Sequence, residues 1–333
     1  MEILKKLMQF QNLTEAEVQW MVDFFLDENV DEQEKLHILI AFTMKRETTE
    51  ELTALTKALI ASMYQTQPTY NNAMCVCGTG GDRSNSFNIS TTVSFVVAAA
   101  GVPIIKHGNR SITSKSGSVD LLEALKVETS SVQNATQDVD EKGISFLSAT
   151  ETYPVFKYIQ PIRKRIPMPT VFNIVGPMIN PFQLDYQVMG VYEPSKMSMI
   201  AKTIQTLGRK RAIVVHGANG MDEATLSGDN LIYEVTPNEI KQYTINAKDF
   251  GLNYADNASL IGGDVDVNKA ITLRILNGTE QGPKRDVVLL NAGIALYVSE
   301  KAASIQEGVH QARKIIDKQF ALKLYQQLGG VSV

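Results

Sequence analysis

Two adjacent carboxylates, Asp222 and Glu223, lie between glycines in the stretch HGANGMDEATLSG at residues 216–228. Magnesium prefers oxygen ligands and often uses one or two carboxylates together with substrate phosphates. The pair therefore fits a metal ion held over a polyphosphate. A lone Asp-Glu dipeptide is most often a solvated acidic turn, so the metal interpretation depends on which other loops lie beside it.

A second loop is almost without large side chains. Residues 78–91, GTGGDRSNSFNIST, follow a short apolar run and begin with Gly78, Gly80 and Gly81. Glycines allow backbone N–H groups to approach an anion closely, and the helix that follows offers its positive end. Arg83 stands where the dinucleotide-binding pattern needs its last glycine, and the G-K-[ST] end of a P-loop is missing. The sequence therefore disfavours an NAD enzyme or a standard NTPase.

A third loop, KHGNRSITSKSGS at residues 106–118, supplies positive charge. Lys106, Arg110 and Lys115 stand among serine and threonine hydroxyls. This mixture suits several phosphate oxygens at once. In isolation such a loop is as often solvated surface, and His107 could serve only the geometry of the loop.

The sequence contains no constellation typical of nucleophilic or zinc catalysis. Its four histidines, His37, His107, His216 and His310, have no metal-ligand spacing and no triad partners. We therefore expect a reaction that needs little proton transfer from the protein. Transfer at an activated phosphosugar meets this requirement, because a metal neutralises the leaving pyrophosphate and anionic surroundings stabilise positive charge on the sugar ring.

The elements that must position these loops are those of an α/β protein. After residue 72, short apolar runs alternate with helical stretches, which predicts βα units and a mostly parallel sheet. We expect strands at 74–77, 102–105 and 212–215, and helices at 92–100, 118–125, 285–297 and 304–328. Parallel strands joined by right-handed connections end on one edge of the sheet, where ligands of such sheets bind. The three loops should therefore converge.

The first 65 residues or so predict short helices. Three pairs have the spacing of a capping box, namely Thr14 with Glu17, Asp31 with Glu34, and Thr48 with Glu51. Short helices bury little by themselves, so these must pack on each other or on a second copy of the chain. We expect Met8, Trp20 and Phe24 to pack in the core.

Composition excludes several classes of protein. The 333 residues are 44% hydrophobic, enough for a sizeable core and for about two domains. Thirty-two basic and 36 acidic residues give a net charge of -4, so we expect no binding to nucleic acid or to an anionic membrane surface. The absence of a long apolar run and of a signal-type start predicts a cytoplasmic protein, in which Cys75 and Cys77 are reduced.

Taken together, the motifs resemble those of the anthranilate phosphoribosyltransferase family of tryptophan biosynthesis. The matching stretches are GTGGD with FNIST, KHGNR with SKSG, FNIVGPMINP (172–181) and GMDEATLSG (220–228). The resemblance implies a nucleoside-phosphorylase-like α/β fold: a small helical domain and a larger α/β domain with a mostly parallel central sheet. We place the helical domain at 1–68, joined by part of about 160–190, and the α/β domain at 69–333. The resemblance also implies a homodimer formed through the helical part.

The implied reaction joins anthranilate and phosphoribosyl pyrophosphate with Mg²⁺, giving N-(5-phosphoribosyl)anthranilate and pyrophosphate. Phosphoribosyl pyrophosphate is the donor substrate of this reaction. By matching position, the residues implied to contact it are Gly78, Gly81, Asp82, Ser86, Asn88, Ile89, Ser90, Thr91, Lys106, His107, Gly108, Asn109, Arg110, Ser111, Ser114 and Ser118. The implied metal positions are Ser90, Asp222 and Glu223, and the implied anthranilate contacts are Gly78, Asn109 and Arg163. A guanidinium suits the acceptor carboxylate, and Lys164 and Arg165 are nearby alternatives. No residue is expected to act as a general base.

Three positions depart from the pattern of the family. Arg83 replaces a usual glycine, Ser86 replaces a usual threonine, and Tyr153-Pro154 replaces a usual His-Pro pair near the acceptor site. Arg83 could add a phosphate contact or stiffen the loop, and Ser86 keeps the hydroxyl. The change at Tyr153 concerns the detail of the acceptor site and not the phosphoribosyl half.

Two other functions remain open from the sequence. One is a pyrimidine-type nucleoside phosphorylase of the same general fold, although the Asp222-Glu223 pair favours a metal-polyphosphate donor over free phosphate. The other is a non-catalytic nucleic-acid-binding relative, which the basic runs at 163–165 and 209–211 would allow and the acidic balance disfavours.

Overall fold

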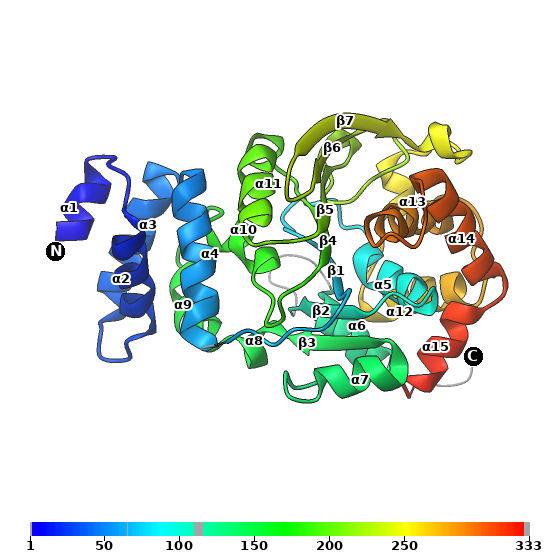
Figure 1. Ribbon diagram of the computed structural model, residues 1–333, viewed down its shortest axis with the longest axis horizontal. Helices are drawn as coiled ribbons and strands as arrows, with labels where there is room; N and C mark the ends of the chain where they lie inside the picture. The colour runs from blue at the N-terminus through cyan, green and yellow to red at the C-terminus, as the bar shows by residue number, and fades with distance from the viewer. Residues whose placement is uncertain (1, 65, 110–115, 330–333) are drawn as a thin grey trace.

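A computed structural model describes residues 2–64, 66–109 and 116–329 (Figure 1). In this part of the chain, seven strands form one sheet in the order β3-β2-β1-β4-β5-β6-β7. The strands are β1 Met74–Gly78, β2 Ile104–Gly108, β3 Ile144–Ser148, β4 Tyr186–Gly190, β5 Arg211–His216, β6 Asp229–Val235 and β7 Ile240–Asn246. Strands β1 to β5 pair in parallel, and β6 and β7 are antiparallel. The predicted mostly parallel sheet is therefore confirmed.

Strand β1 is buried on both faces of the sheet. Met74 and Val76 face one hydrophobic cluster, whereas Cys75 and Cys77 face the other. A strand covered on both sides has no polar face, which explains its continuous apolar sequence. Both cysteines are free, as expected.

Helices from the middle and the end of the chain cover the face toward Met74 and Val76 (Figure 1). They are α5 Ile89–Ala99, α6 Ser118–Ala124, α12 Val265–Leu276, α13 Pro283–Val298, α14 Ile305–Asp317 and α15 Phe320–Gln327. The single helix expected at 304–328 is wrong. The chain breaks between α14 and α15, where Gln319 adopts a left-handed conformation with φ of 58°.

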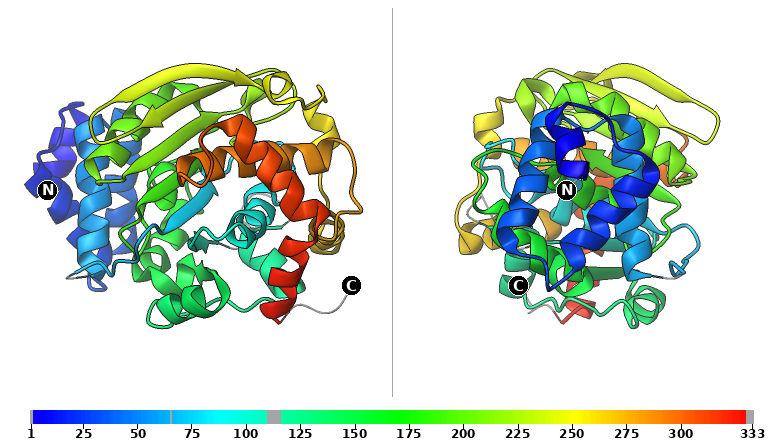
Figure 2. Two further views of the ribbon diagram at one scale, coloured as in Figure 1. Left: turned by 45° about the vertical axis from the view of Figure 1, so that its right-hand side comes forward. Right: turned by 90° about the vertical axis from the view of Figure 1, so that its left-hand side faces the viewer.

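The opposite face carries the N-terminal helices and several later ones. These helices are α1 Glu2–Met8, α2 Glu15–Leu26, α3 Glu32–Lys45, α4 Thr49–Met63, α7 Ala135–Lys142, α8 Ala149–Thr152, α9 Pro154–Arg163, α10 Phe172–Met178 and α11 Met197–Thr206. Short 3-10 turns lie at Pro194–Lys196, Ala218–Gly220, Ala247–Phe250 and Asn257–Leu260. Helices α9 and α10 pack with α1 to α4 in one hydrophobic cluster, and the β6–β7 hairpin extends along one edge of the molecule (Figure 2).

The N-terminal helices partly follow their sequence signals. Capping boxes begin α2 at Thr14 and α4 at Thr48, as predicted. The third box is wrong, because the Asp31 side chain accepts from Gln33 N at 2.7 Å without a reciprocal bond. Core packing is also wrong for Met8 and Trp20, which are 70% and 39% exposed. No helix in the described ranges is long and apolar enough to cross a bilayer.

Glu51 is expected to contribute more to stability than any surface acid of these helices. Its buried carboxylate accepts from Lys45 Nζ at 2.6 Å, Leu13 N at 2.7 Å and Thr48 N at 2.8 Å. Glu51→Ala should lower the free energy of unfolding by about 3–5 kcal/mol, because it leaves a buried lysine without its counter-ion and two N–H groups unpaired. Urea unfolding beside the exposed neighbour variant Glu50→Ala measures this, and equal stability of the two variants would contradict it.

Candidate functional site

The three loops converge at the carboxyl ends of β1, β2 and β5, as predicted. Gly80 N donates to Asp222 Oδ2 at 2.7 Å, which joins the first loop to the acidic loop. Asn88 Nδ2 donates to Ser116 O at 3.2 Å, which joins the first loop to the basic loop. The candidate site therefore lies at the edge of the sheet that the βα topology selects for ligands.

Three carboxylates meet at this edge. One oxygen each of Asp82, Asp222 and Glu223 lie within 4.8 Å of one another. Asp82 Oδ2 and Glu223 Oε2 are buried and have no hydrogen-bond partner among the described residues. Buried acceptors without partners are costly, and a divalent cation would satisfy them. The donor set therefore fits a magnesium ion, with Asp82 added to the carboxylates expected from the sequence.

The electrostatics of these carboxylates also fit a divalent cation. Burial, and then the charge of Asp82, raise the pKa of Asp222 to about 6. Burial, and then the charge of Asp222, raise the pKa of Glu223 well above its usual value. A bound cation would reverse both effects, because it favours the charged carboxylates.

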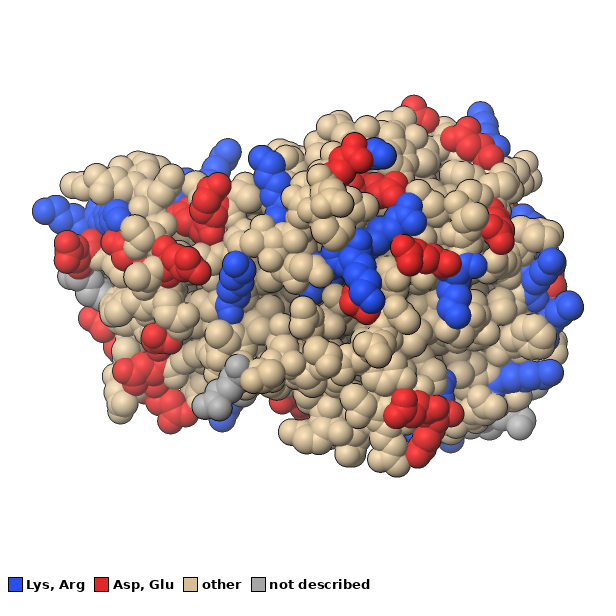
Figure 3. All heavy atoms as spheres, viewed as in Figure 1, with Lys and Arg blue, Asp and Glu red and all other residues tan. Residues whose placement is uncertain are grey.

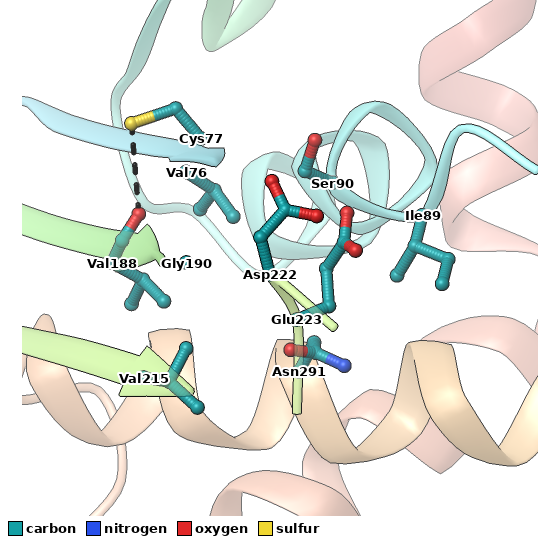
Figure 4. A pocket seen from close by; sticks show the side chains of 10 residues that line it. All are labelled: Val76, Cys77, Ile89, Ser90, Val188, Gly190, Val215, Asp222, Glu223 and Asn291. Atoms are coloured by element: carbon teal, nitrogen blue, oxygen red, sulfur yellow. Dashed lines mark hydrogen bonds between the residues drawn. The ribbon is translucent and has the colours of Figure 1, made fainter. Parts of the chain in front are cut away.

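Ser90 completes this group from the first turn of α5. Figure 4 shows the carboxylates of Asp222 and Glu223 pointing toward the Ser90 hydroxyl. Lys106 Nζ donates to Ser90 Oγ at 3.3 Å and also to Val76 O. Lys106 is only 3% exposed, so its charge is held inside the site and not on the surface. This excludes the solvated-surface alternative for Lys106.

Two asparagine side chains, one of them distant in sequence, fix the acidic loop. Asn291 on α13 accepts from Ala224 N at 3.1 Å and donates to Ala224 O at 2.8 Å, directly after Glu223 (Figure 4). Asn230 on β6 accepts from Thr225 N at 2.7 Å and donates to Thr225 O at 3.0 Å. The sequence analysis missed both asparagines. A buried amide within an otherwise apolar helix is the signal that could have identified Asn291.

Gly190, at the end of β4, is expected to tolerate no side chain. A Cβ at this position would lie 1.4 Å from Asp222 O, a backbone atom. Gly190→Ala should therefore displace the turn at Asp222 and lower the free energy of unfolding by about 3 kcal/mol. Gly176→Ala in α10 is the matched control, because nothing lies within 4 Å of its added Cβ. Thermal unfolding compares the two, and a Gly190→Ala protein as stable as the control would contradict the steric argument.

The second Gly-Gly-Asp sequence, at 262–264, supports the first loop. Gly262 N donates to Asn85 O at 2.9 Å, and Gly263 N donates to Asn268 Oδ1 at 2.9 Å. Asn268 Nδ2 in turn donates to Asn88 Oδ1 at 3.0 Å. Asn88, one of the residues expected to contact phosphoribosyl pyrophosphate, therefore uses its side chain to hold two loops together.

Several other residues expected to contact phosphoribosyl pyrophosphate also lie in this region, and they differ in burial and in hydrogen bonding. Ile89 and Thr91 are buried in the first turn of α5, and the Ile89 side chain lines a pocket together with Ser90 and Asp222 (Figure 4). Gly81 is exposed with φ of 84°, and Ser86 Oγ accepts from Ser84 Oγ at 3.2 Å. Ser118 Oγ donates to Asn109 O at 3.2 Å.

Close backbone approaches explain two more of the expected glycines. A Cβ on Gly78 would lie 2.3 Å from Asp222 Oδ2, and a Cβ on Gly108 would lie 2.1 Å from Ser118 Oγ. Arg110, Ser111 and Ser114 lie outside the residues that the structure describes.

His107 points away from the carboxylates. Its Nε2 lies 2.8 Å from Gly176 O, and its Nδ1 lies 3.2 Å from Asn180 Nδ2. Because a carbonyl only accepts, Nε2 carries the proton and Nδ1 accepts from the amide. The Tyr153 ring packs against this imidazole, and its hydroxyl donates to Ile179 O at 2.9 Å. The departure at Tyr153 therefore places a fully buried phenol beside α10.

Arg163 lies at the end of α9 without a carboxylate partner among the described residues. Its NH2 donates to Asn173 Oδ1 at 3.2 Å, and burial lowers its pKa to about 10. The guanidinium remains charged at neutral pH and fits an incoming carboxylate. Lys164 and Arg165 are exposed, and Arg165 donates to Gln33 Oε1 at 2.6 Å, so neither alternative has comparable burial.

Arg83, at a position where the family usually has glycine, is exposed in the first loop. Arg83 has φ of 57°, a left-handed conformation that glycine adopts without strain, and it borders a cavity of about 300 Å³ with Asp82 and Met221.

Figure 3 shows acidic and basic side chains interspersed on the face that it presents. That face offers no continuous basic surface for nucleic acid.

Comparisons with known proteins agree with this geometry. Residues 1–63 match the helical bundle domain of a glycosyl transferase family, and residues 70–322 match its α/β domain. The chain is 56% identical to the anthranilate phosphoribosyltransferase of Staphylococcus saprophyticus, with coverage of 100% of this chain and 98% of the relative. It is 52% identical to a Staphylococcus aureus relative of the same name, with coverage of 99% and 100%.

Solved structures give the same result. The crystal structure of anthranilate phosphoribosyltransferase from Thermus thermophilus aligns with a TM-score of 0.91 and 32% identity over 98% of each chain. A Saccharomyces cerevisiae enzyme of that name, in complex with phosphoribosyl pyrophosphate and Mg, has the same fold, with a TM-score of 0.89 and 21% identity over 98% of this chain and 96% of its own. The chain described here belongs to the anthranilate phosphoribosyltransferase family.

Proposed function

We propose that this protein transfers the phosphoribosyl group of phosphoribosyl pyrophosphate to the amino group of anthranilate in tryptophan biosynthesis. The observation that carries the proposal is the cluster of Asp82, Asp222 and Glu223 beside a glycine-rich loop in a member of this family. The products are N-(5-phosphoribosyl)anthranilate and pyrophosphate.

Mg²⁺ is the proposed cofactor. Asp82, Asp222, Glu223 and the Ser90 hydroxyl would hold it, and it would neutralise the pyrophosphate as that group leaves. The yeast relative, whose structure contains both phosphoribosyl pyrophosphate and Mg, supports this assignment.

The donor would be bound by the loops at 78–91 and 106–118. Backbone N–H groups near Gly78 and Gly81 and the first turn of α5 suit the phosphate oxygens. Lys106 adds a buried positive charge beside Ser90. Large side chains in the first loop would prevent this approach, which accounts for its composition.

The acceptor would bind between these loops and Arg163, whose guanidinium suits the anthranilate carboxylate. The neutral aromatic amine attacks the sugar carbon and loses its proton after attack, so no strong base is required. The protein acts by positioning the two substrates and by electrostatic stabilisation.

The organisation of the molecule is proposed on the same grounds. We assign a helical domain at 1–68 with part of about 160–190, an α/β domain at 69–333, and a cytoplasmic location. Exposed Met8, Phe10, Trp20 and Met44 on or beside α1 to α3 support a homodimer through the helical part. Sedimentation should give twice the chain mass of 36.7 kDa, and a monomer at micromolar concentration would contradict the dimer.

The activity is tested by following anthranilate fluorescence in the presence of Mg²⁺ and phosphoribosyl pyrophosphate. Fluorescence should fall only when all three components and the protein are present. A parallel reaction with a pyrimidine nucleoside and phosphate tests the phosphorylase alternative, which the adjacent carboxylates disfavour. Phosphorolysis without loss of anthranilate would overturn the proposal.

A further inference from the structure

The carbonyl groups at the end of α10 are bound by side chains from several different elements. A helix leaves its last four carbonyls without partners inside the helix. Here Val175 O accepts from Ile179 N at 3.1 Å, and Gly176 O accepts from His107 Nε2 on β2 at 2.8 Å. Pro177 O accepts from Gln187 Nε2 on β4 at 2.8 Å, and Met178 O accepts from Arg209 NH2 at 3.5 Å.

The next two carbonyls are bound in the same way. Ile179 O accepts from the Tyr153 hydroxyl at 2.9 Å, and Asn180 O accepts from Gln67 Nε2 at 2.8 Å. Ile179 and Asn180 are fully buried, so their carbonyls need partners within the protein. Partners from β2, β4, the turn before β5 and the linker after α4 therefore fix this end of α10 in one position.

Arg209 is the most unusual of these partners. It lies in the turn between α11 and β5, is 2% exposed, and has no carboxylate within 4.0 Å among the described residues. Burial lowers its pKa to about 10, so the group remains charged at neutral pH. A buried charge is costly, and here the Met178 carbonyl at the end of α10, the Gln187 amide oxygen and the charge of Asp185 offset it.

Arg209 also orients Gln187. The Gln187 amide oxygen accepts from Arg209 Nε at 3.2 Å, which turns its Nε2 toward Pro177 O. The planar guanidinium therefore fixes two successive carbonyls of α10, one directly and one through the glutamine.

The other end of α10 leads to Arg163. Asn173, in the first turn of α10, accepts from Thr170 N at 3.0 Å and from Arg163 NH2 at 3.2 Å. Phe172 presents its ring to the same guanidinium, with 6.0 Å between the ring centroid and Cζ. Since α10 spans only Phe172–Met178, a shift of its end would move the side chains that hold Arg163.

We propose that Arg209 is a positioning residue for the acceptor, acting through α10 to hold Arg163 where it meets the anthranilate carboxylate. This inference rests on the proposed function, because it takes anthranilate as the acceptor. Arg209 itself contacts neither substrate in this account.

The test compares Arg209→Met and Arg209→Lys with the neighbouring control Lys210→Met, whose side chain is 55% exposed. Arg209→Met should raise the KM for anthranilate about tenfold and leave the KM for phosphoribosyl pyrophosphate within about twofold. The KM of Arg209→Lys for anthranilate should lie between those of Arg209→Met and the wild type, because the ammonium keeps the positive charge but not the planar set of N–H donors. The control should match the wild type.

A double-mutant cycle distinguishes positioning from general damage. In an Arg163→Ala background, Arg209→Met should change the anthranilate KM by less than about twofold, since the group it positions is gone. Equal increases of both KM values, loss of kcat alone, or additive effects in the cycle would overturn the proposal. If Arg209→Met does not fold, the same cycle with Arg209→Lys decides. A wild type without anthranilate turnover would instead remove the proposed function, and with it this inference.

Discussion

Replacing Asp222 with asparagine is expected to lower turnover about 100-fold at saturating Mg²⁺, because one of the three carboxylates proposed to bind the metal is lost. The substitution keeps an oxygen that can accept from Gly80 N, so the loop contact at 2.7 Å can persist. The loss should therefore reflect the metal and not the fold. Steady-state assays measure the turnover of this variant, with Asp266→Asn, a change of an exposed acid of α12, as the control. Unchanged turnover of Asp222→Asn would remove Asp222 from the metal site.

The same variant should make the metal-free protein more stable at pH 8. Burial and the charge of Asp82 raise the pKa of Asp222 from 3.8 to about 6, so the folded protein binds this proton more tightly than the unfolded chain. The resulting stabilisation is present below about pH 4 and is lost as pH rises toward 6. At pH 8 the ionised carboxyl costs about 3 kcal/mol, which asparagine removes. Thermal unfolding in EDTA at pH 5 and 8 tests the sign, and a less stable variant at pH 8 would refute it.

Arg163→Ala should raise the KM for anthranilate about 100-fold with little change in the KM for phosphoribosyl pyrophosphate. The half-buried guanidinium remains charged with a pKa of about 10, and its partners among the described residues are Asn173 and the Phe172 ring. A charge-assisted pair in such surroundings is worth about 3 kcal/mol. Initial rates at varied acceptor concentration measure the change, with exposed Arg165→Ala as the control.

An acceptor without the carboxylate gives a sharper comparison. The wild type should prefer anthranilate strongly over aniline, and Arg163→Ala should lose most of that preference. An undiminished preference in the variant would place the carboxylate on another residue.

The topology was predictable because its signals are local. Apolar runs followed by glycine-rich loops predicted β1, β2 and β5, and the βα alternation predicted convergence of the loops. The capping boxes at Thr14 and Thr48 also depend only on neighbouring residues. Strands β3 and β4 were not anticipated, since short strands outside such a repeat depend on pairing partners distant in sequence. The β6–β7 hairpin was also not anticipated, although its two strands are neighbours in sequence.

The supporting part of the site was less predictable. Adjacent Asp222 and Glu223 are visible in the sequence, but the approach of Asp82 across 140 residues depends on the folded loops. The buried amide of Asn291 and the charge of Arg209 act through backbone groups, and backbone groups leave no mark on residue type. Trp20 was predicted to pack in the core but is 39% exposed. An apolar residue at helical spacing can equally face solvent or a partner chain.

The most direct measurement is the stoichiometry of products by mass spectrometry after incubation with anthranilate, phosphoribosyl pyrophosphate and Mg²⁺. We predict one N-(5-phosphoribosyl)anthranilate for each pyrophosphate released, with neither formed in EDTA. Pyrophosphate release without the anthranilate adduct, or adduct formation that is indifferent to removal of the metal, would contradict the account.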